Sequence, residues 1–201
     1  MIQLFDLWLE AAERHELSAV CLLDQSAAYD LLCHQTFSEK LRIYNFCESS
    51  TSWIMSYLSG RSQQVVVESK LSETIPCEDD GVPQGSVLGG LFHVINSNDF
   101  PACHQEGEAV VYVDDDSDTV HAAEPERLKE IIQQEAQNSA SWLSDNKLCV
   151  AGEKSKLLVI GTRMRRQQKL NSKMTIHVDG REVVETESEK LLGDIINNEL
   201  T

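Results

Sequence analysis

The sequence predicts an α+β fold in which a small antiparallel sheet has helices packed on one face. Apolar residues recur at helical spacing in residues 3–15 and again in residues 125–146. Segments rich in strand-forming residues occur as pairs joined by short turns, at 62–77 and at 175–185. The Asp179-Gly180 turn inside the second pair is a strong hairpin signal. Because strands joined by tight turns run antiparallel, we expect hairpins backed by amphipathic helices.

Composition indicates one domain with a real core and limits the partners. The chain has 201 residues, 41% of them apolar, and a formal net charge of -16, which opposes nonspecific attraction to nucleic acid or anionic lipid. The six cysteines are scattered without a CxxC pair, as reduced thiols in an intracellular protein would be. Asp6, Glu10 and Glu13 interrupt any signal peptide, and no apolar stretch is long enough to span a membrane. We expect a soluble cytoplasmic or nuclear protein with no membrane partner.

The other expected elements follow from local patterns. In chain order they are a buried strand at 18–23, helical segments from Ser26 to Ile43 and from Asn45 to Leu58, a helix at 87–98 capped by Ser86, a hairpin at 110–122, a strand at 157–160 and a last strand at 191–196. The inward stripe of the helix at 125–146 comprises Leu128, Ile131, Ile132, Glu135, Ala136, Ser139, Trp142 and Leu143.

The stretch Val110–Asp118 dominates the search for a functional site. Its strand-forming residues run into Asp114, Asp115 and Asp116, with Asp118 two positions later. Carboxylates held this closely repel one another unless a cation offsets the repulsion, and hard oxygen ligands suit Mg²⁺ or Mn²⁺. The alternative is an acidic hairpin turn that is simply solvated.

Three further residues allow two interpretations each. Asp24 ends a buried strand, where it is either a helix N-cap or a metal ligand. Arg61 is either a solvated loop cation or a phosphate contact. Lys154 is either a surface cation or a positioned acid or phosphate contact.

Several other kinds of site are excluded by spacing. An EF-hand beginning at Asp114 would need Gly and Glu where Thr119 and Pro125 stand. A carboxylate hydrolase needs two carboxylates in different environments, which adjacent aspartates at one turn do not provide. The loop at 81–89 matches neither the phosphate-loop nor the dinucleotide fingerprint.

Four ordered segments resemble the palm motifs of reverse transcriptases, most closely the non-LTR (LINE-type, jockey-like) retrotransposon enzymes. They are Leu23–Asp30, Gly81–Gly89, Asn98–Pro101 and Tyr112–Asp115. Supporting matches are Tyr57–Gln63, Trp142 with Asn146 and Leu148, Lys154-Ser155, and Leu192-Gly193. The resemblance covers about residues 15–197. It implies a polymerase palm with partial fingers elements and RNA-directed DNA synthesis, with an RNA template, a DNA primer and a dNTP as partners.

The resemblance also implies roles for the acidic residues and their neighbours. Asp24 and Asp114 would bridge two Mg²⁺ ions (Mn²⁺ being possible), and Asp115 would assist. The backbone carbonyl of Gln25 would complete one metal shell, and Lys154 would protonate or steady the diphosphate.

Further roles concern the nucleotide and the primer. Tyr29 matches the aromatic gate that excludes a ribose 2′-hydroxyl, and the segment Pro83, Gln84 and Gly85 would shape the floor under the nucleotide. By the same resemblance, Tyr112 and Val113 would contact the primer end, and Leu192 and Gly193 would form the primer-grip turn. On this interpretation Asp116 and Asp118 belong to an outgoing strand and its solvated flank.

The chain also departs from the family pattern. Val113 replaces a usual alanine, Gly90 replaces a usual proline, and His93, Asn96 and Ser97 are polar where the helix is usually apolar or aromatic. We expect residues 1–201 to be one reverse transcriptase domain without the N-terminal fingers motifs, the thumb or an endonuclease, and to be weak or inactive alone.

The sequence also allows two functions other than a polymerase. The first is a non-catalytic remnant or co-opted interaction protein that keeps the palm fold. The second is a binding-only nucleic-acid module, which is disfavoured because the one basic cluster, at 163–173, is small.

Overall fold

The computed structural model describes residues 2–26, 28–77, 80–112, 115–150, 154–170, 172–191 and 193–199. The chain divides into two compact units. The larger unit comprises Met1–Ser26, Asp99–Ser144 and Cys149–Thr201, and the smaller unit comprises Ala27–Asn98 and Asp145–Leu148. Among the described residues, no helix is both long enough and apolar enough to cross a bilayer.

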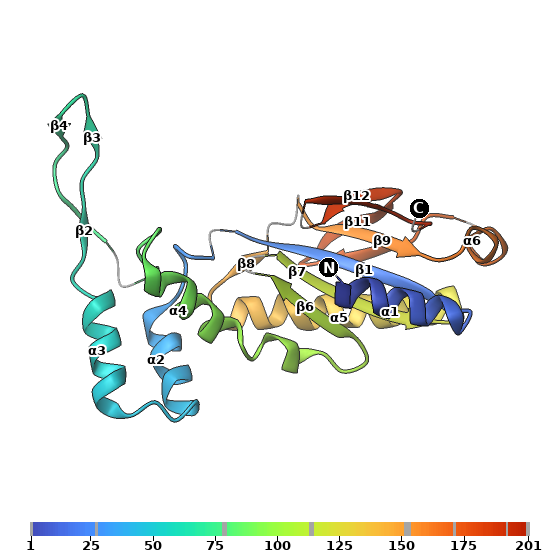
Figure 1. Ribbon diagram of the computed structural model, residues 1–201, viewed down its shortest axis with the longest axis horizontal. Helices are drawn as coiled ribbons and strands as arrows, with labels where there is room; N and C mark the ends of the chain where they lie inside the picture. Colours follow the sequence, from blue (N-terminus) through green and yellow to red (C-terminus); the bar gives the residue numbers. More distant parts are fainter. Residues whose placement is uncertain are drawn as a thin grey trace. The chain divides into compact units, whose positions relative to one another are not determined.

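A seven-stranded sheet forms the centre of the larger unit (Figure 1). Its strand order is β10-β11-β9-β1-β7-β6, and β8 pairs with the end of β1. The strands are β1 (Leu17–Ser26), β6 (Glu108–Tyr112), β7 (Asp115–Ala122), β8 (Cys149–Val150), β9 (Lys156–Ile160), β10 (Thr175–Val178) and β11 (Arg181–Thr186). All pairings are antiparallel except that of β9 with β11. The predicted α+β class is confirmed, with a sheet that is larger than expected and mixed.

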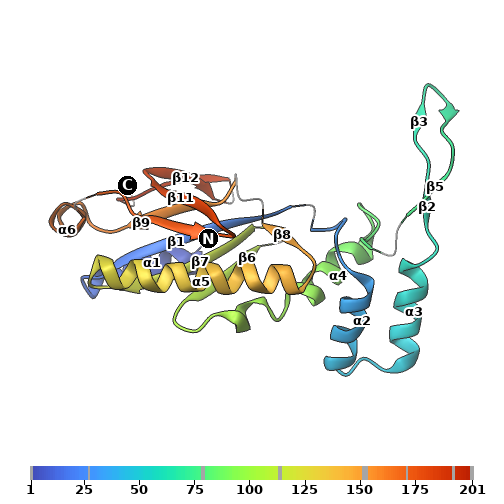
Figure 2. The ribbon, with the colours of Figure 1, turned by 180° about the vertical axis from the view of Figure 1, so that it is seen from behind.

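Helices cover both faces of this sheet, rather than the one face expected (Figures 1 and 2). Leu17, Ala19 and Cys21 of β1 share a buried core with helix α5 (Pro125–Asp145). Val20 points the other way and packs with helix α1 (Ile2–Glu13), β12 (Ser188–Leu191) and β13 (Asp194–Asn197). The alternation of side chains along a strand explains how β1 contributes to both cores.

Three helices form the core of the smaller unit. They are α2 (His34–Ile43), α3 (Glu48–Leu58) and α4 (Val87–Ser97), and they pack through Phe37, Leu41, Ile54, Leu58 and Phe92. A projecting hairpin follows α3, formed by the pairs β2 (Ser62–Gln63) with β5 (Ile75–Pro76) and β3 (Val66–Val67) with β4 (Lys70–Leu71) (Figure 1). Ser86 caps α4 by accepting a hydrogen bond from the Gly89 backbone, which confirms the predicted cap.

Two sequence predictions are wrong in a way that local geometry explains. The helix expected from Ser26 begins only at His34, because the carbonyls of Tyr29 and Leu32 accept hydrogen bonds from the loop at 81–82 instead of from a helical turn. The single strand expected at 191–196 is two antiparallel strands, β12 and β13, reversed near Gly193, whose φ is +98°. The inward stripe predicted for α5 is confirmed, since every member is buried.

Candidate functional site

The pairing of β1 with β7 brings Asp24 next to the acidic turn. The register places Leu23 opposite Asp116 and Asp24 opposite Asp115, and β6 places Tyr112 opposite Asp115 from the other side. Val113 and Asp114 lie outside the described residues. Two segments that are far apart in the sequence, β1 and β7, therefore bring Asp24 and Asp115 side by side, as the resemblance implies.

The carboxylate of Asp24 is one-third exposed and is contacted by a cation. The ammonium nitrogen of Lys154 lies 3.2 and 3.3 Å from its two oxygens. Both residues line a cavity of about 160 Å³, together with Lys156 and Glu189. Because Asp24 lies within β1 and caps no helix, the N-cap interpretation is wrong. Lys154 is thus an ion-pair partner of Asp24 rather than an isolated surface cation.

The residues on the other face of these strands are buried. Gln25 is 4% exposed, and its amide donates a 2.6 Å hydrogen bond to Asp116, which is 1% exposed. Asp118, two residues along β7, is fully buried. The prediction that Asp116 and Asp118 lie on a solvated flank is wrong, because β7 is flanked by β1 and β6 and its inner face packs against α5.

Asp118 belongs to a buried hydrogen-bonded cluster that the sequence did not reveal. Its two carboxylate oxygens lie 2.8 Å from His104 Nε2 and 2.8 Å from Ser139 Oγ. Burial lowers the pKa of His104, but hydrogen bonds and charge from Asp118 and Cys103 outweigh burial and raise that pKa to about 10. The available signal was Ser139, a polar residue in the predicted inward stripe of α5, which had to find a buried partner.

A second polar member of that stripe holds the chain just before β6. The carboxylate of Glu135 accepts hydrogen bonds from the backbone amides of Gln105, Glu106 and Gly107, at 3.0, 2.7 and 3.2 Å. Burial raises the pKa of Glu135, but hydrogen bonds from the Glu106 and Gln105 amides and from Asn138, together with the charge of His104, outweigh burial and lower the pKa below its usual value. Since β6 ends at Tyr112, α5 fixes the start of the strand that leads to the acidic turn.

The smaller unit contains the residues predicted to contact the nucleotide. Tyr29 stacks on the buried ring of His93, with centroids 5.0 Å apart and an interplanar angle of 21°. This stacking gives a physical reason for a planar ring at position 93. Pro83, Gln84 and Gly85 form the loop before α4, and the Gln84 amide contacts the carboxylate of Asp30.

Arg61 does not project freely into solvent, because two of its guanidinium nitrogens bond backbone carbonyls. Its Nε donates to the Leu58 carbonyl at 2.7 Å, which satisfies an end group of α3. Its Nη2 donates to the carbonyls of Gly81 at 2.7 Å and Asp80 at 3.1 Å. The interpretation of Arg61 as a simply solvated loop cation is therefore wrong, because Arg61 holds the end of α3 to the loop that carries Gln84; the phosphate contact stays a prediction.

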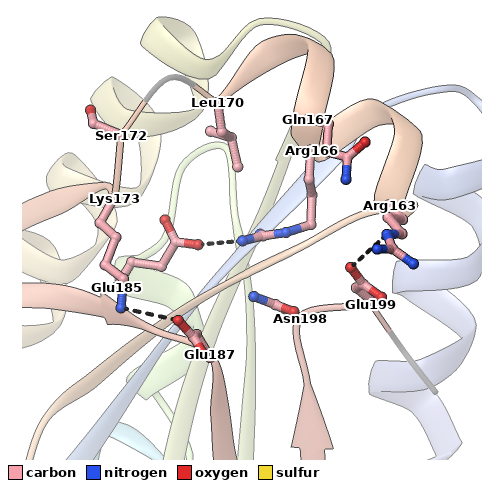
Figure 3. Close-up of a pocket in the computed structure, with 10 residues that line it drawn as sticks. All are labelled: Arg163, Arg166, Gln167, Leu170, Ser172, Lys173, Glu185, Glu187, Asn198 and Glu199. Carbon is pink, nitrogen blue, oxygen red and sulfur yellow. Dashed lines mark hydrogen bonds and ion pairs between the residues drawn. The ribbon is translucent and has the colours of Figure 1, made fainter.

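The basic cluster at 163–173 is neutralised by neighbouring acceptors (Figure 3). Helix α6 (Arg163–Lys169) carries Arg166, which bonds Glu185 at 2.8 Å and the Val159 carbonyl. The other cations of the cluster bond or pair as follows: Lys169 with Glu124 at 2.7 Å, Lys173 with Glu187 at 3.5 Å, Arg163 with Glu199 at 4.0 Å, and Arg165 with the Ala123 carbonyl at 3.1 Å. Of these cations, Arg163, Arg166 and Lys173 line a cavity of about 420 Å³ together with their acidic partners Glu199, Glu185 and Glu187, so each of the three positive charges has a negative one beside it.

The remaining predicted residues lie at turns. Tyr112 is 61% exposed at the end of β6. Gly193 lies in the turn between β12 and β13, and Leu192 lies outside the described residues.

The acidic residues at the ends of β1 and β7 have the chemistry that a hard divalent cation requires. The Asp24 side chain is 34% exposed and carries two carboxylate oxygens, and Asp115 lies opposite Asp24 in the strand register. No group of three histidine, cysteine or acidic side chains able to hold a metal occurs within the described part of the chain, from which Asp114 is missing. The donor chemistry fits Mg²⁺ or Mn²⁺, with Asp114 as the expected further ligand.

Comparisons with known proteins assign the family. The fold is similar to that of apo telomerase from Candida tropicalis truncated from its C-terminal domain, with 15% sequence identity and a TM-score of 0.62. The match covers 100% of this chain and 39% of the telomerase chain. Telomerase from Candida tropicalis in complex with a TWJ fragment of telomeric RNA gives 14% identity, a TM-score of 0.65, and coverage of 100% of this chain and 32% of that one. At this identity the likeness shows a shared fold. A search of curated proteins gives no significant match. Residues 4–194 match the family "Reverse transcriptase (RNA-dependent DNA polymerase)", so the chain belongs to that family.

Proposed function

We propose that residues 1–201 are the reverse transcriptase domain of a non-LTR, LINE/jockey-like element, which extends a DNA primer on an RNA template with dNTPs, and that the chain is weak in this reaction when it acts alone. The supporting observation is the β1–β7 register, which pairs Asp24 with Asp115 beside the acidic turn and within reach of Lys154. Strand pairing of this kind positions carboxylates on a rigid element, as a metal site requires.

Asp24, Asp114 and Asp115 are the residues that would hold Mg²⁺, with Mn²⁺ as a substitute. Bound there, two such ions would supply charge neutralisation at the attacking hydroxyl and at the departing diphosphate. The backbone carbonyl of Gln25 would complete one metal shell. The buried side chain of Gln25 donates a hydrogen bond to Asp116, which anchors this residue within β1.

Lys154 supplies the cation of the site. Its ammonium already contacts the Asp24 carboxylate, so it lies where it can attract the negative diphosphate or donate a proton to it. In this proposal Tyr112, Val113, Leu192 and Gly193 contact the primer.

The nucleotide would be selected by residues of the smaller unit. Stacking on His93 limits the motion of the Tyr29 ring, as a steric gate against a ribose 2′-hydroxyl requires. Pro83, Gln84 and Gly85 would form the surface under the nucleotide, on a loop held by Arg61.

The polar residues of α4 do not favour the alternative of a decayed remnant. His93 is stacked on Tyr29, and the hydroxyl of Ser97 donates a hydrogen bond to the His93 carbonyl at 3.0 Å. The polar side chains at positions 93 and 97 therefore have contacts within the core, as buried polar groups of an intact fold do.

Primer extension on matched RNA and DNA templates tests this proposal. The 201-residue chain should extend a DNA primer on RNA at a low rate, in keeping with the weak activity expected of it alone. Asp114→Asn should abolish this extension, whereas Asp6→Asn, on the exposed side of α1, should not. Equal extension by the wild-type chain and Asp114→Asn would overturn the catalytic assignment. Extension on DNA templates alone would overturn the assignment to RNA-directed synthesis.

A further inference from the structure

Gln84 is held by a carboxylate from a different segment of the smaller unit. Its amide nitrogen Nε2 lies 2.9 and 3.0 Å from the two oxygens of Asp30. We propose that Asp30 is a positioning residue that fixes the orientation of the Gln84 amide, so that Gln84 presents its oxygen to a sugar hydroxyl of the bound nucleic acid or nucleotide. This inference rests on the proposed function and adds a residue and a hydrogen-bonding direction to it.

The direction follows from what each group can donate or accept. An ionised carboxylate only accepts hydrogen bonds, whereas a glutamine amide donates from its nitrogen and accepts at its oxygen. Only the nitrogen end of Gln84 can therefore face Asp30. The oxygen Oε1 is turned away from Asp30 and is left as the acceptor for a ligand.

The backbones of the two segments are held together independently of this contact. The amides of Gly81 and Val82 donate to the carbonyls of Leu32 and Tyr29, each at 2.8 Å. Gly81 has a φ of +76°, and a Cβ there would lie 2.7 Å from the backbone oxygen of Asp30. Only glycine allows this close approach, so the spacing between Asp30 and the loop is set before a ligand binds.

Two side chains hold the same loop from its other side. The carbonyl of Gly81 accepts hydrogen bonds from His34 Nε2 at 2.8 Å and from Arg61 Nη2 at 2.7 Å. With the loop held at both sides, the remaining freedom of Gln84 is the rotation of its side chain, and Asp30 restricts that rotation.

The surroundings of this pair suit a nucleotide unit. Asp30, Arg61, Pro83 and Gln84 line an open cavity of about 680 Å³, within the size range of small-molecule sites. A polymerase must accept every template base, so a contact to a base edge at this place would restrict the sequences it copies. Sugar hydroxyls are donors present at every position, either as the 2′-hydroxyl of an RNA strand or as the 3′-hydroxyl of an incoming nucleotide.

The test exchanges the two groups. Gln84→Glu would place two carboxylates against each other and should weaken ligand binding. In the double variant Asp30→Asn/Gln84→Glu, the new amide donates to the new carboxylate, which still turns an acceptor oxygen outward, so binding should recover. Asp30→Ala should release the Gln84 amide, and Glu39→Gln on the exposed side of α2 is the control.

Two binding ratios identify the hydroxyl. Dissociation constants of the 201-residue chain are measured by fluorescence anisotropy for a primer on RNA and on DNA of the same sequence, and then for dTTP and 2′,3′-dideoxy-TTP on that complex. The wild-type chain should bind the hydroxyl-bearing ligand about threefold to tenfold more tightly, the worth of one hydrogen bond, in one of the two comparisons: RNA against DNA template, or dTTP against 2′,3′-dideoxy-TTP. Asp30→Ala should lose that preference, whereas the double variant and Glu39→Gln should keep it.

Three results would overturn the inference alone, provided that Asp24-dependent primer extension persists. They are no hydroxyl preference in the wild-type chain, an unchanged preference in Asp30→Ala, and a double variant as weak as Gln84→Glu. A wild-type chain that neither binds nor extends a primer would overturn the proposed function, and this inference with it.

Discussion

The ion pair between Lys154 and Asp24 predicts competition with a divalent cation. The Lys154 ammonium contacts both oxygens of Asp24, so a metal that binds this carboxylate must displace the ammonium or share the carboxylate with it. We expect Lys154→Gln to strengthen Mn²⁺ binding, because it removes both the competing contact and a like charge.

The size of the effect follows from the exposure of the two side chains. They are 67% and 34% exposed, and the shorter distance is 3.2 Å. Ion pairs this exposed contribute about 0.2–1 kcal/mol, so Mn²⁺ affinity should rise by a factor of at most about five. A larger rise would mean that Lys154 lies against the carboxylate more tightly than these exposures indicate.

Electron paramagnetic resonance of free Mn²⁺, titrated with protein in the absence of nucleic acid, measures this affinity directly. Lys156→Gln is the matched control, because Lys156 lines the same cavity without contacting Asp24 in the described structure. Asp24→Asn should weaken Mn²⁺ binding. Unchanged or weaker binding by Lys154→Gln, or unchanged binding by Asp24→Asn, would refute the reasoning.

Three further predictions concern the supports of the site, all read by urea unfolding. The pKa of His104 is about 10 in the folded protein and near 6.5 in the unfolded chain, so His104 stays protonated only in the folded state between pH 7 and 9. The free energy of unfolding should therefore fall over this range, by at most about 1.4 kcal/mol per pH unit. His104→Gln should flatten this slope, and equal slopes for the variant and the wild-type chain would contradict the pairing with Asp118. Glu135→Gln should lower the free energy of unfolding by about 1–3 kcal/mol, because three backbone amides lose their charged acceptor, whereas exposed Glu130→Gln on the same helix should change it little. Gly81→Ala should lower the free energy of unfolding by about 1–3 kcal/mol, because its φ is +76° and the new Cβ meets a backbone oxygen of Asp30. Gly90→Ala, in open space on α4, should leave this free energy unchanged or raise it. Equal effects of the two substitutions would contradict the close approach at Gly81.

The parts of the fold that follow from local pattern are predictable from the sequence. The inward stripe of α5 and the Ser86 cap of α4 depend on residues within one helix, and both are confirmed. The proximity of Asp24 to the acidic residues after Tyr112 was predictable only from the order of the family motifs. The local pattern of either segment does not indicate which strands pair.

The parts that failed depend on contacts between distant segments. The resemblance placed Asp118 on a solvated flank of an outgoing strand, yet this strand, β7, lies inside the sheet and packs against α5, where His104 and Ser139 bond the buried carboxylate. Residues 28–32 have apolar residues at helical spacing, yet the loop at 81–82 takes the carbonyl hydrogen bonds that a helix would need. Likewise, the sequence gives no role to Asp30 beyond its place at the end of a motif, because its contact with Gln84 joins positions 54 apart.

The proposed function requires the carboxylates brought together by the β1–β7 register to support metal-dependent nucleotide addition. The experiment is the incorporation of one deoxynucleotide on an RNA template, measured against Mg²⁺ concentration. We predict that the wild-type chain and Asp6→Asn add the nucleotide, that EDTA stops the reaction, and that Asp24→Asn and Asp115→Asn each reduce the rate by at least about a hundredfold. Addition by Asp24→Asn at the wild-type rate, or addition that persists in EDTA, would contradict the account.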